Sequence, residues 1–415
     1  METPAKNEAA SDIQAGTPPA EAGDPHPVLS LPVKAFRWMA SYHFSCLLLF
    51  FLFVLTLLGT LYQVNNGVYA AQEKYFESVV VVQEFGVIPL PLPGGRLLLT
   101  LLFFNLLCGA ILRARKGWSR IGILTAHLGI LMLLAGSFIT YRYAQGGQMV
   151  LYEGQQSGYF ESRDEWELAV TPLGDAGTAR QSVVALPEFK DNHSDSSLLV
   201  SNDALPFELD VSGFLPNATP QPKAADTPPK ARMVDGYFLK PEEPSTDPGR
   251  DLPGLIVAVR DGEGNAFQEG IVWAGQKAPW AVETRDGSWS FKLQRRRWPL
   301  PFTLVLNTFS RELHPRTAMA KAYASEVTRI DGGTRQAVRI SMNEPLRSNG
   351  YTLYQASWGP QDAAPGTPLY SVLAVSRDPA ERFPLYACII VTCGLVLHFT
   401  IRLLGYLRQA GVRKS

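Results

Sequence analysis

Two histidines lie within long apolar stretches of this 415-residue chain, which has six histidines in all. His127 lies in TAHLGILMLLAGSFIT (125–140), and His398 lies in CGLVLHFTIRLL (393–404). An ionisable side chain inside a membrane span is costly, and it is by default a candidate functional residue. The two imidazoles could ligate a metal-containing cofactor, or they could hydrogen-bond to a neighbouring helix.

Four stretches are apolar and long enough for a membrane span, which needs about 20 residues. They cover about 44–63, 96–113, 120–141 and 384–405. Basic residues cluster before the first stretch, between the second and the third, and after the fourth. Because Lys and Arg concentrate in cytoplasmic loops, four spans with both termini in the cytoplasm fit all three clusters. The segments between spans one and two and between spans three and four then lie outside.

Composition narrows the class of protein. The formal net charge is zero, which argues against a nucleic-acid-binding surface.

Residues 1–43 predict a disordered cytoplasmic tail and an interfacial helix, with no cleavable signal peptide. Residues 44–141 hold spans one to three, and residues 384–415 hold span four and a cytoplasmic tail. The four cysteines all fall in spans, where we expect them to be small packing residues.

Residues 142–383 predict a large β-rich, sandwich-like extracytoplasmic domain. Short alternating or β-branched runs recur through it, separated by turn signals such as RDGS and DGG. Residues 64–95 are predicted to be an outer loop, apolar in patches, that lies against the outer membrane surface or against the β-rich domain. Residues 217–252 are predicted to be a long loop. The segments LPFELDVSGF (205–214) and LPFTLVLNTF (300–309) share a pattern, which either an internal duplication or convergent strand chemistry would explain.

Helical phase gives the third span two faces. A stripe of small residues suited to close helix packing runs along it: Gly122, Thr125, Ala126, Gly129 and Gly136. His127 lies nearly opposite this stripe. At a rise of about 1.5 Å per residue, His127 and His398 are predicted at similar depth near the cytoplasmic ends of their helices.

Several motifs point to a known family. They are LLGTLYQ (57–63), FFNLLCGAILR (103–113), HLGILMLLAGSF (127–138), GQMVLYEGQQS (147–157), PFTLVLNTFSRELHPRTAMAKAYASEV (301–327) and ISMNEPLRSNGYTLYQASW (340–358). Together they extend over most of the chain. The chain thereby resembles the ResB-like family, the membrane subunit of System II cytochrome c biogenesis.

The resemblance implies haem transport and cytochrome c assembly. Such proteins pair with a CcsA/ResC-type membrane protein, export haem and support its covalent attachment to apocytochrome c outside the membrane. This implies haem b as a non-covalently bound cargo, and a multi-pass protein of the cell inner membrane with a periplasmic domain. It also implies an accessory subunit of a synthase complex. The alternative is a membrane assembly factor that chaperones apocytochrome c without binding haem.

The same resemblance gives roles to the intramembrane polar residues. His127 and His398 become candidate ligands of the haem iron, which commonly takes axial histidine. His127 matches the family's intramembrane histidine in its His-Leu-Gly context. Arg402 could pair with a haem propionate or anchor its helix at the headgroups. In the family the second axial ligand is expected from the partner subunit, so pairing of both histidines on one iron is a separate hypothesis.

Other polar residues carry more ordinary expectations. Asn105 in the second span could bridge helices. The triplet Arg295–Arg297 could bind an anionic partner, or it could form a solvated strand end. His43, His193 and His314 are expected at headgroups, surfaces or turns.

Overall fold

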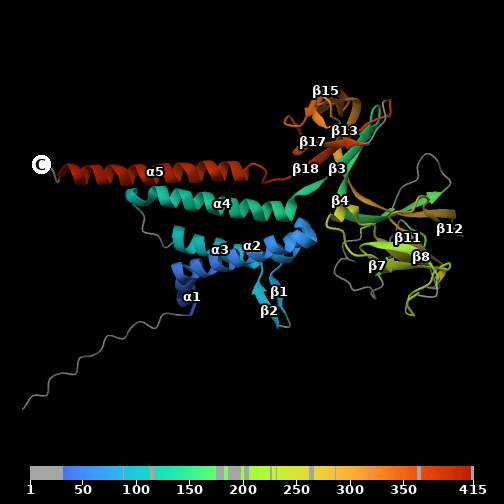
Figure 1. The fold of residues 1–415 in the computed structure, drawn as a ribbon, viewed down its shortest axis with the longest axis horizontal. Coiled ribbons are helices and arrows are strands. Elements are labelled where there is room, and N and C mark those ends of the chain that lie inside the picture. The colour runs from blue at the N-terminus through green and yellow to red at the C-terminus, as the bar shows by residue number, and fades with distance from the viewer. Residues whose placement is uncertain are drawn as a thin grey trace, which may run out of the picture.

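The computed structural model describes residues 31–86, 88–112, 117–173, 182–185, 198–200, 205–224, 227–229, 231–260, 266–285, 287–317, 319–361 and 366–412. Within these ranges, long helices lie side by side at one end of the molecule and a β-rich region lies at the other (Figure 1). The prediction of a large β-rich domain is therefore confirmed. The tail predicted at the N-terminus lies outside the described residues up to residue 30.

The helices follow the chain in two groups. The first group comprises α1 (Leu31–Met39), α2 (Tyr42–Ala71) with its π-helical extension η1 (Gln72–Phe76), α3 (Gly95–Leu106) with its π-helical extension η2 (Leu107–Leu112), and η3 (Trp118–Arg120) leading into α4 (Ile121–Tyr143). The last helix is α5 (Phe383–Val412).

Three of the described helical segments are long and apolar enough to cross a membrane: Tyr42–Phe76, Trp118–Tyr143 and Phe383–Ala410. This composition indicates membrane association. The second predicted span is a shorter apolar helix, Gly95–Ala110, so the prediction of four spans is not confirmed. The helix begins at Gly95, one residue before the predicted start, because the alternate prolines of the preceding strand hold the chain extended up to Pro93.

α4 and α5 pack antiparallel at very short range. A Cβ on Gly394 would lie 2.5 Å from the backbone nitrogen of Ala126, so only a residue without a side chain fits there. Four members of the predicted small-residue stripe are buried: Gly122, Ala126, Gly129 and Gly136. Thr125 is only half-buried. The stripe is thus the surface that lets the two backbones approach, as small residues do in membrane helix pairs.

The α4–α5 pair continues directly into the β-rich domain. β3 (Gln145–Tyr152) begins just after α4, and β18 (Tyr370–Arg377) ends shortly before α5. The two strands pair antiparallel with Gln145 opposite Arg377. Where helices give way to strands, the Thr140 hydroxyl donates to the Asp378 carboxylate over 2.8 Å. The antiparallel α4–α5 helix pair therefore continues as the antiparallel β3–β18 strand pair.

The segment 64–95, predicted as the outer loop between spans one and two, contains mostly regular structure. α2 extends to Ala71 with a kink at Gly67, where φ is 84°. The segment then forms an antiparallel hairpin of β1 (Val80–Phe85) and β2 (Ile88–Pro93). The run of four valines at 79–82 favours a strand, which the loop prediction overlooked.

The β-rich domain is built on one large sheet with the strand order β15–β14–β13–β4–β3–β18–β17–β16; β12 also pairs with β13, and β5 with β4. A second sheet has the order β11–β10–β7–β6, and β8 pairs with β9. The remaining bounds are β4 Gln156–Leu173, β5 Ser182–Ala185, β6 Leu198–Val200, β7 Glu208–Leu215, β8 Ala218–Pro222, β9 Tyr237–Pro241, β10 Gly254–Arg260, β11 Ala266–Trp273, β12 Trp280–Thr284, β13 Gly287–Leu313, β14 Ala320–Asp331, β15 Thr334–Ser341, β16 Leu346–Ser348 and β17 Tyr351–Gly359.

The predicted loop 217–252 is also only partly a loop. It contains the β8–β9 hairpin and the short 3₁₀ turn η5 (Pro248–Arg250). The many prolines of this segment argued against predicting strands in it, because proline is depleted in strands and is tolerated mainly at edge strands. In the two-stranded β8–β9 hairpin both strands are edge strands, so proline is tolerated there.

The domain has two lobes with separate cores (Figure 1). In the first lobe the second sheet packs on the β4–β13 pair through residues such as Leu168, Val257 and Phe291. In the second lobe the large sheet curls so that β15 approaches β17. The long strands β4 and β13 run through both lobes, and the register between them shifts between Arg295 and Arg297.

The two segments with the shared Leu-Pro-Phe pattern lie in different lobes. Phe207 and Leu209 are buried in the first core, and their counterparts Phe302 and Leu304 are buried in the second. However, β7 lies between β10 and β6, whereas β13 lies between β4 and β14. The segments share an inward-facing pattern but not a place in a sheet, which favours convergent strand chemistry over duplication.

The close approach of α4 and α5 makes Gly394→Ala destabilising. The added Cβ would meet backbone atoms of α4, and overpacking of this kind typically costs about 1–3 kcal/mol. Gly405→Ala on the same helix is the matched control, since a Cβ there meets nothing within 4 Å. Thermal unfolding in detergent, followed by circular dichroism, should show a lower midpoint for Gly394→Ala only. Equal midpoints for the two variants would contradict the packing described here.

Candidate functional site

His127 is half-buried on α4 and makes one hydrogen bond that fixes its chemistry. Its Nδ1 lies 2.7 Å from the carbonyl oxygen of Ile123, one turn earlier in the same helix. A carbonyl oxygen only accepts, so Nδ1 carries the ring proton. In the neutral imidazole Nε2 then keeps its lone pair, which is the arrangement found in metal-ligating histidines whose other nitrogen donates to a backbone carbonyl.

The imidazole of His127 does not face α5. At about 100° per residue, it points roughly 145° away from the middle of the buried stripe. α4 lies between α5 and α3 in Figure 1, and α3 and its extension η2 also pack on α4. Leu131, one turn further along the same face, is buried. His127 is therefore directed toward the α3 side of the helix group, as the sequence pattern predicts for the face opposite the stripe.

His398 has a different environment. Its backbone nitrogen is the atom that a Cβ on Gly122 would meet first, so it lies at the α4–α5 contact. Its Nδ1 is buried and has no hydrogen-bond partner among the described residues. A buried N–H without an acceptor is rarer in proteins than an under-used acceptor. The neutral ring is therefore expected to carry its proton on Nε2, which leaves neither nitrogen well placed to bind iron.

The backbone positions of the two histidines are offset along the helices. His398 lies opposite Gly122, and His127 is five residues further along α4. At 1.5 Å per residue this is a difference of about 7.5 Å in depth between their backbone positions. The prediction of similar depth is thus not confirmed, because depth depends on how the two helices align when they pack. Arg402 lies one turn beyond His398 and is exposed.

The other polar residues singled out in the sequence mostly have structural partners. Asn105 is buried in α3, accepts from the Ser45 hydroxyl over 2.7 Å and donates to the Met39 carbonyl over 2.6 Å. It bridges the helices as predicted. His43 and His314 are exposed, and His193 lies outside the described residues.

In the described part of the chain, no group of three or more His, Cys, Asp or Glu side chains could hold a metal ion.

The triplet Arg295–Arg297 lies in the middle of β13, so the prediction of a strand end is wrong. Arg295 stacks its guanidinium 3.8 Å from the ring centre of Trp166 and donates to the Gly249 carbonyl over 2.6 Å. Burial lowers the pKa of Arg295, although nearby carboxylates oppose this effect. Arg296 pairs with Glu165 and Arg297 with Glu161. All three arginines have partners inside the domain.

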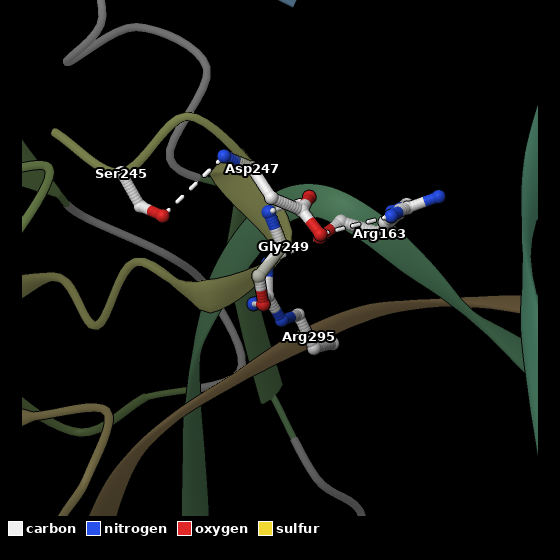
Figure 2. Close-up of polar contacts among 5 residues, drawn as sticks. All are labelled: Arg163, Ser245, Asp247, Gly249 and Arg295. Carbon is white, nitrogen blue, oxygen red and sulfur yellow. Dashed lines mark hydrogen bonds and ion pairs between the residues drawn. The ribbon is translucent and has the colours of Figure 1, made fainter. Parts of the chain in front are cut away.

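Figure 2 shows Arg295 in a polar cluster with Arg163, Ser245, Asp247 and Gly249. The Asp247 carboxylate accepts from the Gly249 backbone N–H over 3.0 Å and forms a 3.0 Å ion pair with Arg163. The Arg163 guanidinium also lies 5.5 Å from the ring centre of Tyr69, near the end of α2. This junction, which no sequence motif marks, connects the helices to the β-rich domain.

The junction places Asp247 in a setting that favours its charged form. The backbone hydrogen bond from Gly249 lowers the pKa of Asp247, and the ion pair with Arg163 adds to this effect, while partial burial opposes it. A carboxylate with a lowered pKa in the folded state stabilises the fold above its unfolded pKa, which is about 3.9 for Asp. That stability is lost as the pH falls through the lower, folded value.

These features define a class of protein in which apolar, membrane-type helices are joined to a large β-rich domain. Residues 257–369 match the model of the ResB-like family, which is somewhat more than a quarter of the chain. The resemblance expected from the motifs at 301–327 and 340–358 is therefore confirmed for this segment. It implies a general role in cytochrome c biogenesis. His127 and His398 lie outside the matched residues. No curated protein matches the chain.

Asp247→Asn should destabilise the protein by about 1 kcal/mol at pH 7, since charge-assisted hydrogen bonds are worth more than neutral ones and partial exposure reduces the gain. The difference from the unchanged protein should shrink as the pH falls below about 4. Chemical denaturation at pH 7 and pH 3 measures both values. Glu283→Gln, at an exposed position on β12, is the control. A difference that does not depend on pH would contradict the role given to the Asp247 charge.

Proposed function

We propose that this chain is the ResB-type subunit of a System II cytochrome c biogenesis complex. With a CcsA/ResC-type partner it carries haem b across the cell inner membrane and supports its covalent attachment to apocytochrome c. Both termini face the cytoplasm, and the β-rich domain faces the periplasm. The apolar helix Gly95–Ala110 crosses the membrane as a shorter fourth span. The chain itself is an accessory subunit of the synthase.

The observation that carries the haem part of this proposal is the hydrogen bond from His127 Nδ1 to the Ile123 carbonyl. It holds the ring in the tautomer in which Nε2 can bind iron. It is also local to one turn of α4, so the ring does not depend on another helix for its orientation. A histidine used only to join helices would be expected to hydrogen-bond across an interface.

His127 is the axial ligand that this subunit contributes, and the second ligand comes from the partner. His398 is the less suited of the two, because its Nδ1 is buried at the α4–α5 contact. Pairing of both rings on one iron would also require them to approach from opposite sides of the same haem. Their different faces and the offset of about 7.5 Å between their backbone positions speak against this. Arg402, exposed beyond His398, can reach a propionate or a headgroup.

The full-length chain, co-produced with a CcsA/ResC-type partner and purified in detergent, tests this assignment. Loss of even an outer partner of a metal ligand typically lowers metal affinity 10–100-fold, so His127→Ala should lower haem content at least about tenfold. The pyridine haemochrome assay and the Soret absorption measure this. His398→Ala is the matched control, since it removes the other intramembrane imidazole, and it should retain its haem.

A ligation defect must be separated from a folding defect. In His127→Gly, free imidazole can occupy the space of the missing ring, so adding it should restore the haem spectrum if the residue acts as a ligand. Retained haem in His127→Ala would overturn the assignment of the ligand. A complex without any Soret band would favour the alternative, a membrane assembly factor that chaperones apocytochrome c without binding haem.

A further inference from the structure

The β1–β2 hairpin is an isolated two-stranded sheet attached at the start of α3, where its base lies beside Gly59 of α2. Among the described strands, β1 and β2 pair only with each other. The hairpin projects sideways from α2 and α3, away from α4 and α5 (Figure 1). It is firmly anchored at its base: the Gly94 N–H donates to the Val79 carbonyl over 2.8 Å, and the Tyr75 hydroxyl donates to the Gln83 side chain.

One part of the hairpin belongs to the core of the helix group. Val81 and Leu92 face each other across the two strands and are buried together with Leu98 of α3. This contact sets the level of the hairpin, because it lies beside the first turns of α3. The exposed part therefore extends at the height of the start of α3.

Both faces of the projecting part are apolar. Val80 and Val82 are exposed on one face by 57% and 56% of their surface, and Ile88 and Leu90 on the other by 68% and 45%. Glu84 is the one charged residue between Val79 and Pro93. A solvated hairpin normally exposes a polar face to water. The four exposed apolar side chains on its two faces therefore indicate that the hairpin contacts an apolar medium as well as water.

The unpaired backbone groups of the hairpin rule out a location in the hydrocarbon core of a bilayer. The outer edge of β1 pairs with no described strand, so its N–H and C=O groups need water or another donor and acceptor. Open sheet edges do not occur in the lipid hydrocarbon, because each unpaired group costs several kcal/mol there. Of water, the headgroup layer and the hydrocarbon core, the headgroup layer offers both water for the backbone and an apolar medium for the side chains.

We propose that the β1–β2 hairpin is a membrane-surface anchor, whose Val80, Val82, Ile88 and Leu90 side chains insert into the headgroup layer of the leaflet next to the β-rich domain. This inference rests on the membrane placement of the helices made under the proposed function. Its ligand is a lipid surface rather than a protein. The prolines at 89, 91 and 93 of β2, which lack N–H donors, make that strand a poor template for a further strand.

Site-directed spin labelling of the full chain in phospholipid vesicles tests the anchor. The four native cysteines are replaced by alanine, and a nitroxide is placed at Val82→Cys or Ile88→Cys. Accessibility to oxygen, which concentrates in lipid, is compared with accessibility to a water-soluble nickel chelate. Phe53→Cys, on the 65% exposed Phe53 of α2, is the lipid control, and Gln336→Cys, exposed on β15, is the aqueous control.

Labels at Val82 and Ile88 should show an oxygen-to-nickel accessibility ratio several-fold above that at Gln336, corresponding to a depth of about 5–10 Å. A ratio equal to that at Gln336 would overturn the anchor. So would labels that neither reagent reaches, because a protein surface then covers the hairpin. If the Phe53 label behaves like the aqueous control, the membrane placement itself fails, which distinguishes that failure from failure of the anchor alone.

Discussion

The close contact between α4 and α5 is the constraint on which the rest of the structure depends. At Gly394 and Ala126 the two backbones approach so closely that no larger side chain fits. The same antiparallel pair continues as β3 and β18, which lie in the middle of the large sheet. The rotation of α4 about its axis is therefore set from both ends, by the helix contact and by the strand register.

This fixed rotation explains why the two histidines differ. Because the small-residue face of α4 is turned toward α5, the opposite face with His127 is turned toward α3. His398 belongs to the contact itself, where space and hydrogen-bond partners are scarce. His127 and His398 lie in similar apolar sequence, but they differ in their ability to bind iron. Only His127 keeps a nitrogen lone pair directed away from the α4–α5 contact.

Much of this could be predicted from local sequence, since apolar length and helical phase are properties of neighbouring residues. The membrane-type helices, the stripe from Gly122 to Gly136 and the orientation of His127 relative to it follow from such patterns. The offset of His127 and His398 could not, because it depends on the alignment of two helices more than 200 residues apart in the chain. The same holds for Arg163 and Asp247, which pair across 84 residues. The tautomer of His127 depends on its side-chain rotamer, which no spacing reveals.

The two lobes of the β-rich domain share the strands β4 and β13, which are 18 and 27 residues long. No flexible linker therefore separates the lobes at this crossing, and each shared strand contributes apolar side chains to both cores. The arginine triplet lies where β13 passes from one lobe to the other, with its partners on β4 and η5. The lobes are thus expected to unfold as one cooperative unit, and any reorientation of the domain toward a bound protein would involve both lobes together.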